Sequence, residues 1–297
     1  MPRRLATAIG FTAVLSWGFL ALFTIGSSPV PPLQLNALCF GIGGLIGLIW
    51  TVRGAGLGVL RQVPWFVYAF GSIGLFGAHF LYFTAFRLAP SAETGLIAYL
   101  WPLLIVLTSG LLPGERLKPL HILGALLAFV GAAVIVLQSG VEMNSAAIGG
   151  YIFALLFAIT WAGYSVLSRR FSTVPSQSVT VYFLIGALLS VGAHLILETT
   201  VWPQSPLGWA AVVSLGLGPV GASFFAWDVG MKHGDIQLLG VASYAAPLLS
   251  TTVLVVAGFS PLSPTLAVAA VLITGGAVLA AMASAGRRRP PTPAEGG

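Results

Sequence analysis

Two matching sets of a glycine, a tyrosine and a proline have the spacing of a ligand-binding helix face. The sets are Gly95, Tyr99 and Pro102, and Gly240, Tyr244 and Pro247. Within each set the residues are four and three positions apart, so they share one side of a helix. A proline exposes a backbone carbonyl oxygen, which a membrane tolerates where the backbone lines a wet cavity. Either proline alone is explained by a kink in a packed helix. Their pairing favours two gating kinks, at Pro102 and Pro247, beside a central site.

Aromatic residues near the middle of apolar segments extend this candidate site. Membrane proteins concentrate tryptophan and tyrosine at the two interfaces, so deeper ones need another explanation. His79, Tyr82, Phe83 and Phe86 recur at helical spacing and form an aromatic face with one polar ring. Such faces are often packed core, but together these residues predict an apolar cavity that suits a flat hydrophobic ligand. The predicted lining is Trp17, His79, Tyr82, Tyr99, Trp101, Trp161, Tyr164 and Tyr244.

No residues in the sequence have the arrangement of a catalytic or metal site. Ser223, within the stretch Gly221 to Phe224, superficially resembles a serine nucleophile with His79 or His194 as its base. It has neither the flanking glycine pattern nor an orienting acid. The histidines and carboxylates lack metal-ligand spacing, and no phosphate-binding glycine loop occurs. We therefore expect no enzyme, no metal and no cofactor.

The composition places these residues in a membrane. Of the 297 residues, 57% are apolar and only 7% are charged, where a soluble domain carries about 25% charged residues. A spanning helix needs about 20 mostly apolar residues. The apolar runs predict an all-α integral membrane protein with ten transmembrane helices. The predicted spans are 5–26, 33–52, 64–87, 91–111, 119–138, 148–169, 177–197, 207–230, 235–258 and 262–284.

The basic residues predict the orientation of these spans. Cytoplasmic loops of membrane proteins carry an excess of lysine and arginine. If the N-terminus is cytoplasmic, ten spans place every lysine and arginine except Arg87 on the cytoplasmic side. The net charge of +6 is thus spread over topology anchors instead of forming a nucleic-acid patch, so no nucleic-acid partner is expected. Both termini are expected in the cytoplasm, the C-terminus as a short basic tail.

The matching glycine, tyrosine and proline sets belong to an internal repeat. A shift of 145 positions superimposes them and also places Arg87 on Lys232, while a shift of 144 places Trp17 on Trp161. Each copy holds five spans, an odd number, so the second copy must enter the membrane from the opposite side. Such inverted repeats build transporters. We expect a first five-helix repeat in residues 1–140 and an inverted five-helix repeat in residues 141–297.

Carboxylates in the predicted spans are few and lie near helix ends. Glu93, Asp228 and Glu198 are each within a few residues of an end, and Asp228 is one turn from Lys232, with which it can pair. Proton-driven transporters usually hold a titrating carboxylate within the membrane. The placement of these three favours facilitated transport. The competing hypothesis is proton coupling through His79, since imidazole titrates near physiological pH.

The fourth span and the turn after it carry a family resemblance. The stretch from Leu81 to Leu117 contains Tyr-Leu-Trp-Pro-Leu at 99–103 and a Gly-Glu-Arg turn at 114–116. Together with the two inverted five-helix halves, this stretch resembles the EamA-type branch of the drug/metabolite transporter superfamily. More specifically, it is similar to the YddG-type aromatic amino acid exporters of bacterial inner membranes. The second half departs from the motif, with Phe-Ser-Pro at 259–261 where the turn would repeat.

The resemblance implies an inner-membrane transporter that exports aromatic amino acids, and flat aromatic drugs, by alternating access. An apolar cavity is equally compatible with threonine-like or branched amino acids and with nucleosides. A channel or a membrane enzyme is the other class of alternative, and a channel would show no saturable, substrate-dependent flux. The expected partners are a small-molecule substrate and the lipid bilayer, and we favour a monomer.

Overall fold

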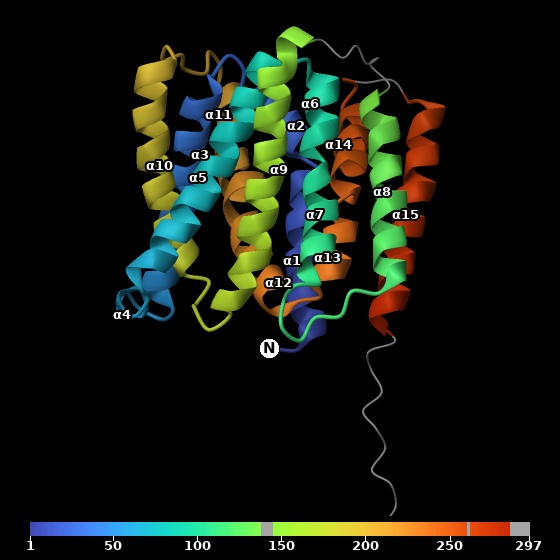
Figure 1. Ribbon diagram of the computed structural model, residues 1–297. Coiled ribbons are helices and arrows are strands. Elements are labelled where there is room, and N and C mark those ends of the chain that lie inside the picture. The colour runs from blue at the N-terminus through green and yellow to red at the C-terminus, as the bar shows by residue number, and fades with distance from the viewer. Residues whose placement is uncertain (138–144, 260–261, 286–297) are drawn as a thin grey trace, which may run out of the picture.

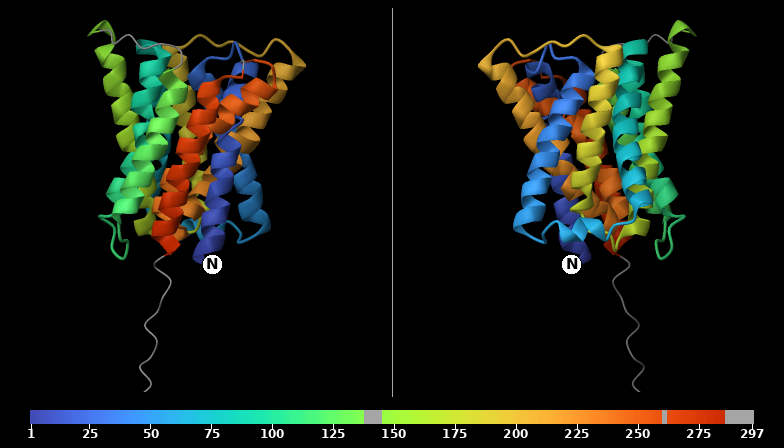
Figure 2. Two further views of the ribbon diagram at one scale, coloured as in Figure 1. Left: turned by 90° about the vertical axis from the view of Figure 1, so that its right-hand side faces the viewer. Right: turned by 90° about the vertical axis from the view of Figure 1, so that its left-hand side faces the viewer.

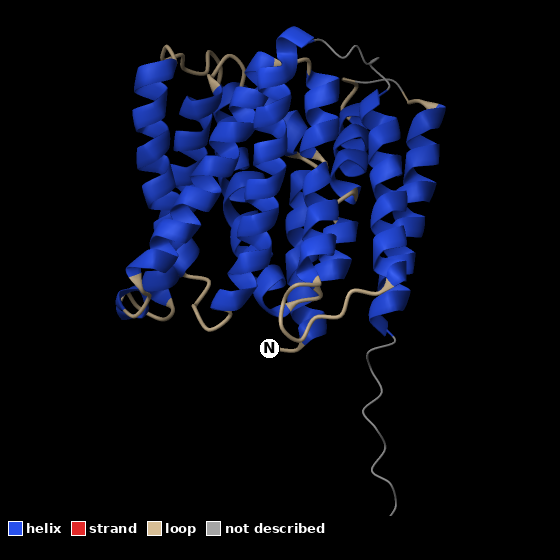
Figure 3. Cartoon of the chain, in the orientation of Figure 1, coloured by secondary structure: helices blue, strands red, loops and turns tan. Residues whose placement is uncertain are grey.

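A computed structural model describes residues 1–137, 145–259 and 262–285 (Figure 1). Within these ranges the chain consists of helices and connecting turns, without a strand (Figure 3). The protein is an all-α integral membrane protein, as predicted. The expected repeat boundary at residues 140 and 141 and the basic C-terminal tail lie outside the described residues.

The helices follow the predicted apolar segments closely. They are α1 (Arg3–Trp17), α2 (Leu20–Gly26), α3 (Pro32–Arg53), α4 (Gly58–Arg61), α5 (Trp65–Leu88), α6 (Ser91–Ala98), α7 (Leu100–Ser109), α8 (Pro119–Val136), η2 (Ser145–Ala147), α9 (Ile148–Ser168), η3 (Arg169–Phe171), α10 (Ser178–Leu197), α11 (Pro206–Leu217), η4 (Gly218–Ala222), α12 (Ser223–His233), α13 (Ile236–Ala242), α14 (Ala245–Val256) and α15 (Pro264–Ala285). In the described part of the chain, nine segments are long and apolar enough to cross a membrane, and the shorter apolar segment Glu93–Ser109 stands at the predicted fourth span.

Four of the predicted spans are interrupted. The segments 5–26, 91–111 and 235–258 each consist of two helices, and the segment 207–230 consists of two α-helices joined by a turn of π-helix. Kinks were predicted in the fourth and ninth spans only, at Pro102 and Pro247. The breaks in the first and eighth spans were not predicted, although both segments are membrane-length spans at the predicted positions.

The two predicted prolines explain the breaks in the fourth and ninth spans. Proline has no N–H to donate to the carbonyl four residues earlier, and its ring clashes with that carbonyl. For Pro102 the carbonyl is that of Ala98, where α6 ends. For Pro247 it is that of Ser243, which directly follows the end of α13. Each break thus lies three to four residues before the proline that causes it.

The other two breaks lie at Pro219 and at Gly18. In the eighth span Pro219 lies inside η4, a single widened turn of π-helix that joins α11 to α12. In the first span the break follows Trp17 at Gly18. A Cβ atom at Gly18 would lie 2.8 Å from the Cβ of Leu249, so only glycine lets α14 approach this point.

The packing of the spans follows the predicted repeat. The second span packs on the seventh, as α3 on α10, and the fifth on the tenth, as α8 on α15. The third packs on the sixth (α5 on α9) and the first on the eighth (α1 on α12), which are equivalent pairs under a five-helix repeat. A Cβ at Gly10 would lie 2.8 Å from the Cα of Gly230, so glycine allows α1 and α12 to cross at backbone distance.

The helices run between two faces, which we call the N-terminal face, where α1 begins, and the opposite face (Figure 1). Helix α9 begins at the opposite face, and the bundle widens toward that face (Figure 2). Helices α1, α7, α12 and α13 occupy the half of the bundle near the N-terminal face, and α2, α6, α11 and α14 occupy the other half. The four interruptions therefore lie at similar depth, near the middle of the bundle.

Candidate substrate site

Four tryptophans from four different spans meet at this depth, and we call them the tryptophan cluster. They are Trp17 at the end of α1, Trp101 in the first turn of α7, Trp161 on α9 and Trp227 on α12. The ring centroid of Trp17 lies 6.0 Å from that of Trp101, 6.3 Å from that of Trp161 and 5.1 Å from that of Trp227. Trp101 and Trp227 are 5.8 Å apart and nearly perpendicular. Edge-to-face geometry of this kind is favourable between aromatic rings.

Two of the indole nitrogens in the cluster have fixed partners. The Nε1 of Trp17 donates to the carbonyl oxygen of Pro219 at 3.1 Å, and the Nε1 of Trp227 donates to the hydroxyl of Ser165 at 3.1 Å. A buried indole N–H normally finds such an acceptor. These bonds orient the two rings, and they connect α1 to η4 and α12 to α9.

His79 and Phe224 extend the cluster toward α3 and α5. The centroid of Phe224 lies 5.5 Å from that of Trp161 and 5.6 Å from that of the His79 ring. His79 also packs on Phe40 at 4.9 Å. The Nδ1 of His79 is 2.9 Å from the carbonyl oxygen of Leu75, which can only accept, so this nitrogen carries the proton and a neutral ring keeps Nε2 as an acceptor.

The predicted tyrosines divide between this cluster and other positions. Tyr164 stacks on Trp161 with centroids 5.5 Å apart. Tyr82 packs on Phe157 with ring centroids 5.1 Å apart. Trp161 and Tyr164 are buried, whereas Tyr82 and Tyr99 are half-buried, on the side of the cluster nearer the opposite face.

Tyr244 lies outside the aromatic cluster. It is fully buried in a separate core among α7, α8, α13 and α15, where its ring is 6.0 Å from that of Phe129. Its hydroxyl accepts a 3.1 Å hydrogen bond from the backbone N–H of Leu103, in the first turn of α7. The first turn of any helix has donors without intrahelical partners. Tyr244 therefore supports the broken fourth span, and the repeat that pairs it with Tyr99 gave no hint of this difference.

The predicted lining did not include Trp227 and Phe224, whose rings contact Trp17 and Trp161. The signal that could have found them is their position on the eighth span, which the repeat makes equivalent to the third. Ser223, the superficial nucleophile, is buried and donates its hydroxyl to the carbonyl oxygen of Pro219, so it serves helix packing. Among the described residues no group of histidines, cysteines and carboxylates has the geometry of a metal site.

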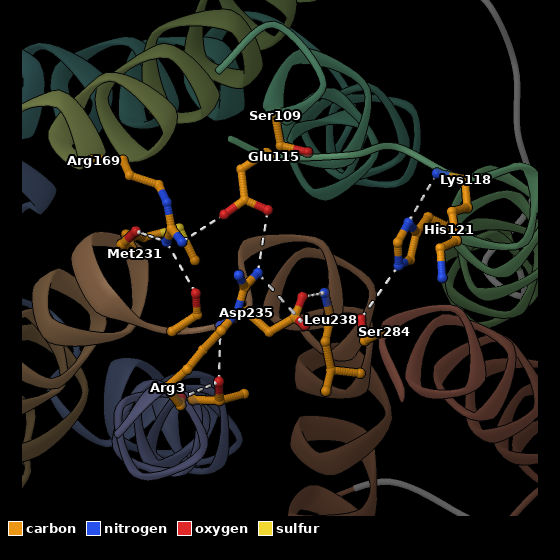
Figure 4. Close-up of polar contacts among 12 residues, drawn as sticks. Arg3, Ser109, Glu115, Lys118, His121, Arg169, Met231, Asp235, Leu238 and Ser284 are labelled. Atoms are coloured by element: carbon orange, nitrogen blue, oxygen red, sulfur yellow. Dashed lines mark hydrogen bonds and ion pairs between the residues drawn. The ribbon is translucent and has the colours of Figure 1, made fainter. Parts of the chain in front are cut away.

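A chain of ion pairs connects several elements at the N-terminal face (Figure 4). We call Arg3, Glu115, Arg169 and Asp235 the N-terminal network. Glu115 is 2.6 Å from Arg169 and 3.2 Å from Arg3, and Arg3 is 3.7 Å from Asp235. Arg169 also donates to the carbonyl oxygens of Met231 and Gly234 at 2.8 Å and 3.0 Å. The network joins α1, the turn before α8, η3 and the start of α13.

The opposite face has a different set of polar contacts, centred on Glu198. This carboxylate accepts hydrogen bonds from the backbone N–H groups of Leu33 and Gln34, the first turn of α3, and from His194 at 2.9 Å. It also forms an ion pair with Arg87. Glu198 directly follows α10, and through these bonds it caps the first turn of α3, a different helix.

Two glycines that the repeat aligns have different environments. A Cβ at Gly240 would lie 2.8 Å from a methyl carbon of Val106, because α13 packs tightly on α7. A Cβ at Gly95 would come no closer than 3.6 Å, to a methyl carbon of Val136. The fourth and ninth spans are thus packed together in the half near the N-terminal face, through α7 and α13.

The model of the EamA-like transporter family matches this chain twice, over residues 4–137 and 148–282. The chain belongs to the EamA-like transporter family. The two matches divide this EamA-like chain into two stretches that each carry five of the predicted spans.

Named relatives match nearly the whole length of this EamA-like transporter. The chain is 52% identical over 285 residues to the aromatic amino acid exporter YddG of Ancylobacter novellus, covering 95% of this chain and 99% of that protein. It is 28% identical over 302 residues to the protein of the same name from Escherichia coli, covering 96% and 99% of the two chains. A solved crystal structure with 52% identity superimposes with a TM-score of 0.90 over 95% of this chain and 99% of the other.

Proposed function

We propose that this EamA-like transporter exports aromatic amino acids across the membrane. The relatives named as aromatic amino acid exporters, matched over nearly their whole length, support this substrate class. A transporter of this kind needs no catalytic residue, metal or cofactor. Its substrates are phenylalanine, tyrosine and tryptophan, with flat aromatic drugs as further candidates.

The substrate site of this proposal is the tryptophan cluster with its neighbours. It comprises Trp17, His79, Tyr82, Tyr99, Trp101, Trp161, Tyr164, Phe224 and Trp227. The single observation that carries the proposal is the convergence of four tryptophans at the depth where four spans are interrupted. Interrupted helices at the midplane between inverted repeats are typical substrate sites of transporters.

Transport proceeds by alternating access of two five-helix halves, residues 1–140 and the inverted 141–297. In the conformation described here the N-terminal network and the contact of α7 with α13 hold one face together. The kinks caused by Pro102 and Pro247 let the two parts of the fourth span, and of the ninth span, move separately. When the N-terminal face opens, the two repeats pack together at the opposite face instead. Tyr244 stabilises the first turn of α7 and does not contact substrate.

The proposal includes a location in the bacterial inner membrane, as a monomer with both termini in the cytoplasm. The basic residues support this orientation. Arg3, Arg169 and Lys232 lie on elements that reach the N-terminal face, and Lys118 directly precedes α8 there, whereas Arg87 lies in the last turn of α5 at the opposite face (Figure 1). Export then begins at the N-terminal face.

Counterflow of labelled tryptophan into proteoliposomes tests the proposal. Trp101→Ala and Tyr99→Ala remove one aromatic wall each, which costs about 0.5–1.5 kcal/mol of ring contact and weakens apparent affinity several-fold. Trp202→Ala is the matched control, because Trp202 is exposed and stacks on Trp209 away from the cluster. Counterflow of threonine, leucine or a nucleoside, without counterflow of aromatic amino acids, would show that the substrate belongs to that other class. Flux without saturation would indicate a channel.

A further inference from the structure

The eighth span contains a buried pair of opposite charges that the aromatic site does not use. The Oδ2 of Asp228 lies 2.8 Å from the Nζ of Lys232, and each side chain is 2% exposed. The pair lies one to two turns from the cluster residue Phe224, on the same helix α12. Burying charge within a membrane protein is costly, and such residues usually mark a substrate or ion pathway.

Contacts with the loop before α10 do not by themselves explain this pair. The hydroxyl of Ser176 donates to Asp228 at 2.6 Å, and Lys232 donates to the carbonyl oxygen of Val174 at 3.0 Å. Packing a loop on a helix does not require a full charge of each sign. Apolar side chains of similar volume replace buried ion pairs at little cost or with a gain in stability. We therefore look for a role of the two charges other than attachment of the loop before α10.

The aromatic site and the charged pair lie in sequence along one side of α12. Phe224, Asp228 and Lys232 are spaced four residues apart, so they follow one another along one side of the helix at about 5.4 Å per turn. Phe224 packs against Trp17, Trp161 and His79 in the aromatic site. In the direction of the N-terminal face, this side of α12 therefore carries the ring of Phe224, then the carboxylate of Asp228, then the ammonium group of Lys232.

An aromatic amino acid carries the same three features in complementary form. Its ring packs on aromatic side chains, its α-ammonium pairs with a carboxylate, and its α-carboxylate pairs with an ammonium group. The two charged groups share one carbon atom and lie two carbon atoms from the ring. The ends of the Asp228 and Lys232 side chains are likewise adjacent, 2.8 Å apart, so one small molecule is enough to contact both.

We propose that Asp228 and Lys232 bind the zwitterionic head group of the substrate when the N-terminal face is open. This inference rests on the proposed function. The α-ammonium takes the place of Lys232 beside Asp228, and the α-carboxylate accepts hydrogen bonds from Lys232. In the conformation described here the two side chains neutralise each other, which keeps the pathway electrically balanced without substrate. The pair thereby selects zwitterions over amines and acids with the same ring.

Substrate selectivity tests the pair, with counterflow of tryptophan, tryptamine and indole-3-propionate in proteoliposomes. Lys232→Gln leaves only the carboxylate, so the flux ratio of tryptamine to tryptophan rises about tenfold or more over that of the unmodified protein. Asp228→Asn leaves only the ammonium group, so the ratio of indole-3-propionate to tryptophan rises by a similar factor. Charged hydrogen bonds have strengths that correspond to changes of this size.

A matched control separates substrate binding from loop attachment. Ser176→Ala removes a loop contact of Asp228 and keeps both charges, so it leaves both flux ratios at their original values. If the single charge variants fold poorly, the neutral double variant Asp228→Asn/Lys232→Gln replaces them, and it loses the preference for tryptophan over both analogues.

Two results overturn the inference, and they differ from each other. Equal loss of all three fluxes in folded charge variants, with unchanged ratios, makes the pair a structural element only. Absence of tryptophan counterflow in the unmodified protein refutes the proposed function, and the assignment of the pair with it.

Discussion

The indole N–H of Trp17 donates a hydrogen bond of 3.1 Å to the carbonyl oxygen of Pro219 and so joins the interruption of the first span to the π-helical turn of the eighth. The two residues are 202 positions apart in the sequence. This bond connects two of the broken helices that surround the tryptophan cluster, and it fixes the ring that contacts the other three tryptophans.

Trp17→Phe should keep an aromatic ring in the cluster and lose this hydrogen bond. A neutral hydrogen bond contributes about 0.5–1.5 kcal/mol, so we expect the free energy of unfolding in mixed micelles to fall by about 1 kcal/mol. Trp202→Phe changes an exposed tryptophan on the opposite face and should leave that free energy within about 0.5 kcal/mol. Equal stability of the Trp17→Phe variant and the unmodified protein would show that the bond contributes nothing.

Glu115→Gln should favour the conformation that is open to the N-terminal face. Glu115 joins Arg3 to Arg169 with its side chain 4% exposed, and removing the charge weakens both ion pairs. After replacement of Cys39, a cysteine introduced at the buried Ser109 should react with a soluble thiol reagent several times faster in the Glu115→Gln background. Glu198→Gln acts at the opposite face and should not increase this rate. Slower or unchanged labelling would mean that the network does not hold the face closed.

The stabilisation that Glu198 provides at the opposite face should depend on pH below about 4.5. Burial raises the pKa of this carboxyl group, but the hydrogen bonds from His194, Leu33 and Gln34 and the charge of Arg87 outweigh burial, so its pKa lies below the ordinary 4.5. The unfolded chain then takes up a proton at higher pH than the folded chain. The stabilisation is complete above the ordinary value and is lost as pH falls through the lowered one.

Thermal unfolding in detergent measures this dependence. Between pH 6 and pH 3 the melting temperature of the unmodified protein should fall more steeply than that of Glu198→Gln, which has no carboxyl group to titrate at this position. Parallel curves for the two proteins would show that Glu198 does not contribute to the acid sensitivity.

The orientation can be tested with cysteines at Ser145 and Gly286. Ser145 begins η2 at the opposite face, and Gly286 follows α15 just outside the described residues. With both termini in the cytoplasm, an impermeant thiol reagent added to intact cells should label the cysteine at Ser145 and not the one at Gly286. Labelling of both from the same side would contradict the inverted arrangement of the two halves.

A pH gradient should not drive accumulation of substrate. The carboxylate of Asp228 is buried within the eighth span but is paired with Lys232, so the pair carries no net charge. We expect facilitated export, in which an imposed pH gradient across proteoliposomes leaves labelled tryptophan at equilibrium. Accumulation above equilibrium that is abolished by His79→Ala would favour proton coupling through that histidine instead.

The sequence by itself determined the membrane architecture. Lengths of apolar runs, prolines and the distribution of basic residues are local properties, and a helix in lipid must satisfy its backbone hydrogen bonds within its own segment. The spans, the breaks before Pro102 and Pro247 and the pairing of Asp228 with Lys232 could therefore be predicted from nearby residues. The close approach of α14 to Gly18 could not, because it depends on how distant segments pack.

Only the tertiary structure decided which side chains meet. The repeat treats Tyr99 and Tyr244 as equivalent, yet Tyr244 is fully buried and bonds to the backbone of α7, while Tyr99 is half-buried at the break between α6 and α7. It also decided that Trp227 joins Trp17 at 5.1 Å. The reason is physical: a spacing of 3.6 residues per turn says which residues share a face of one helix, but the neighbour of that face depends on how ten segments pack, and close packing lets the two halves adopt different contacts.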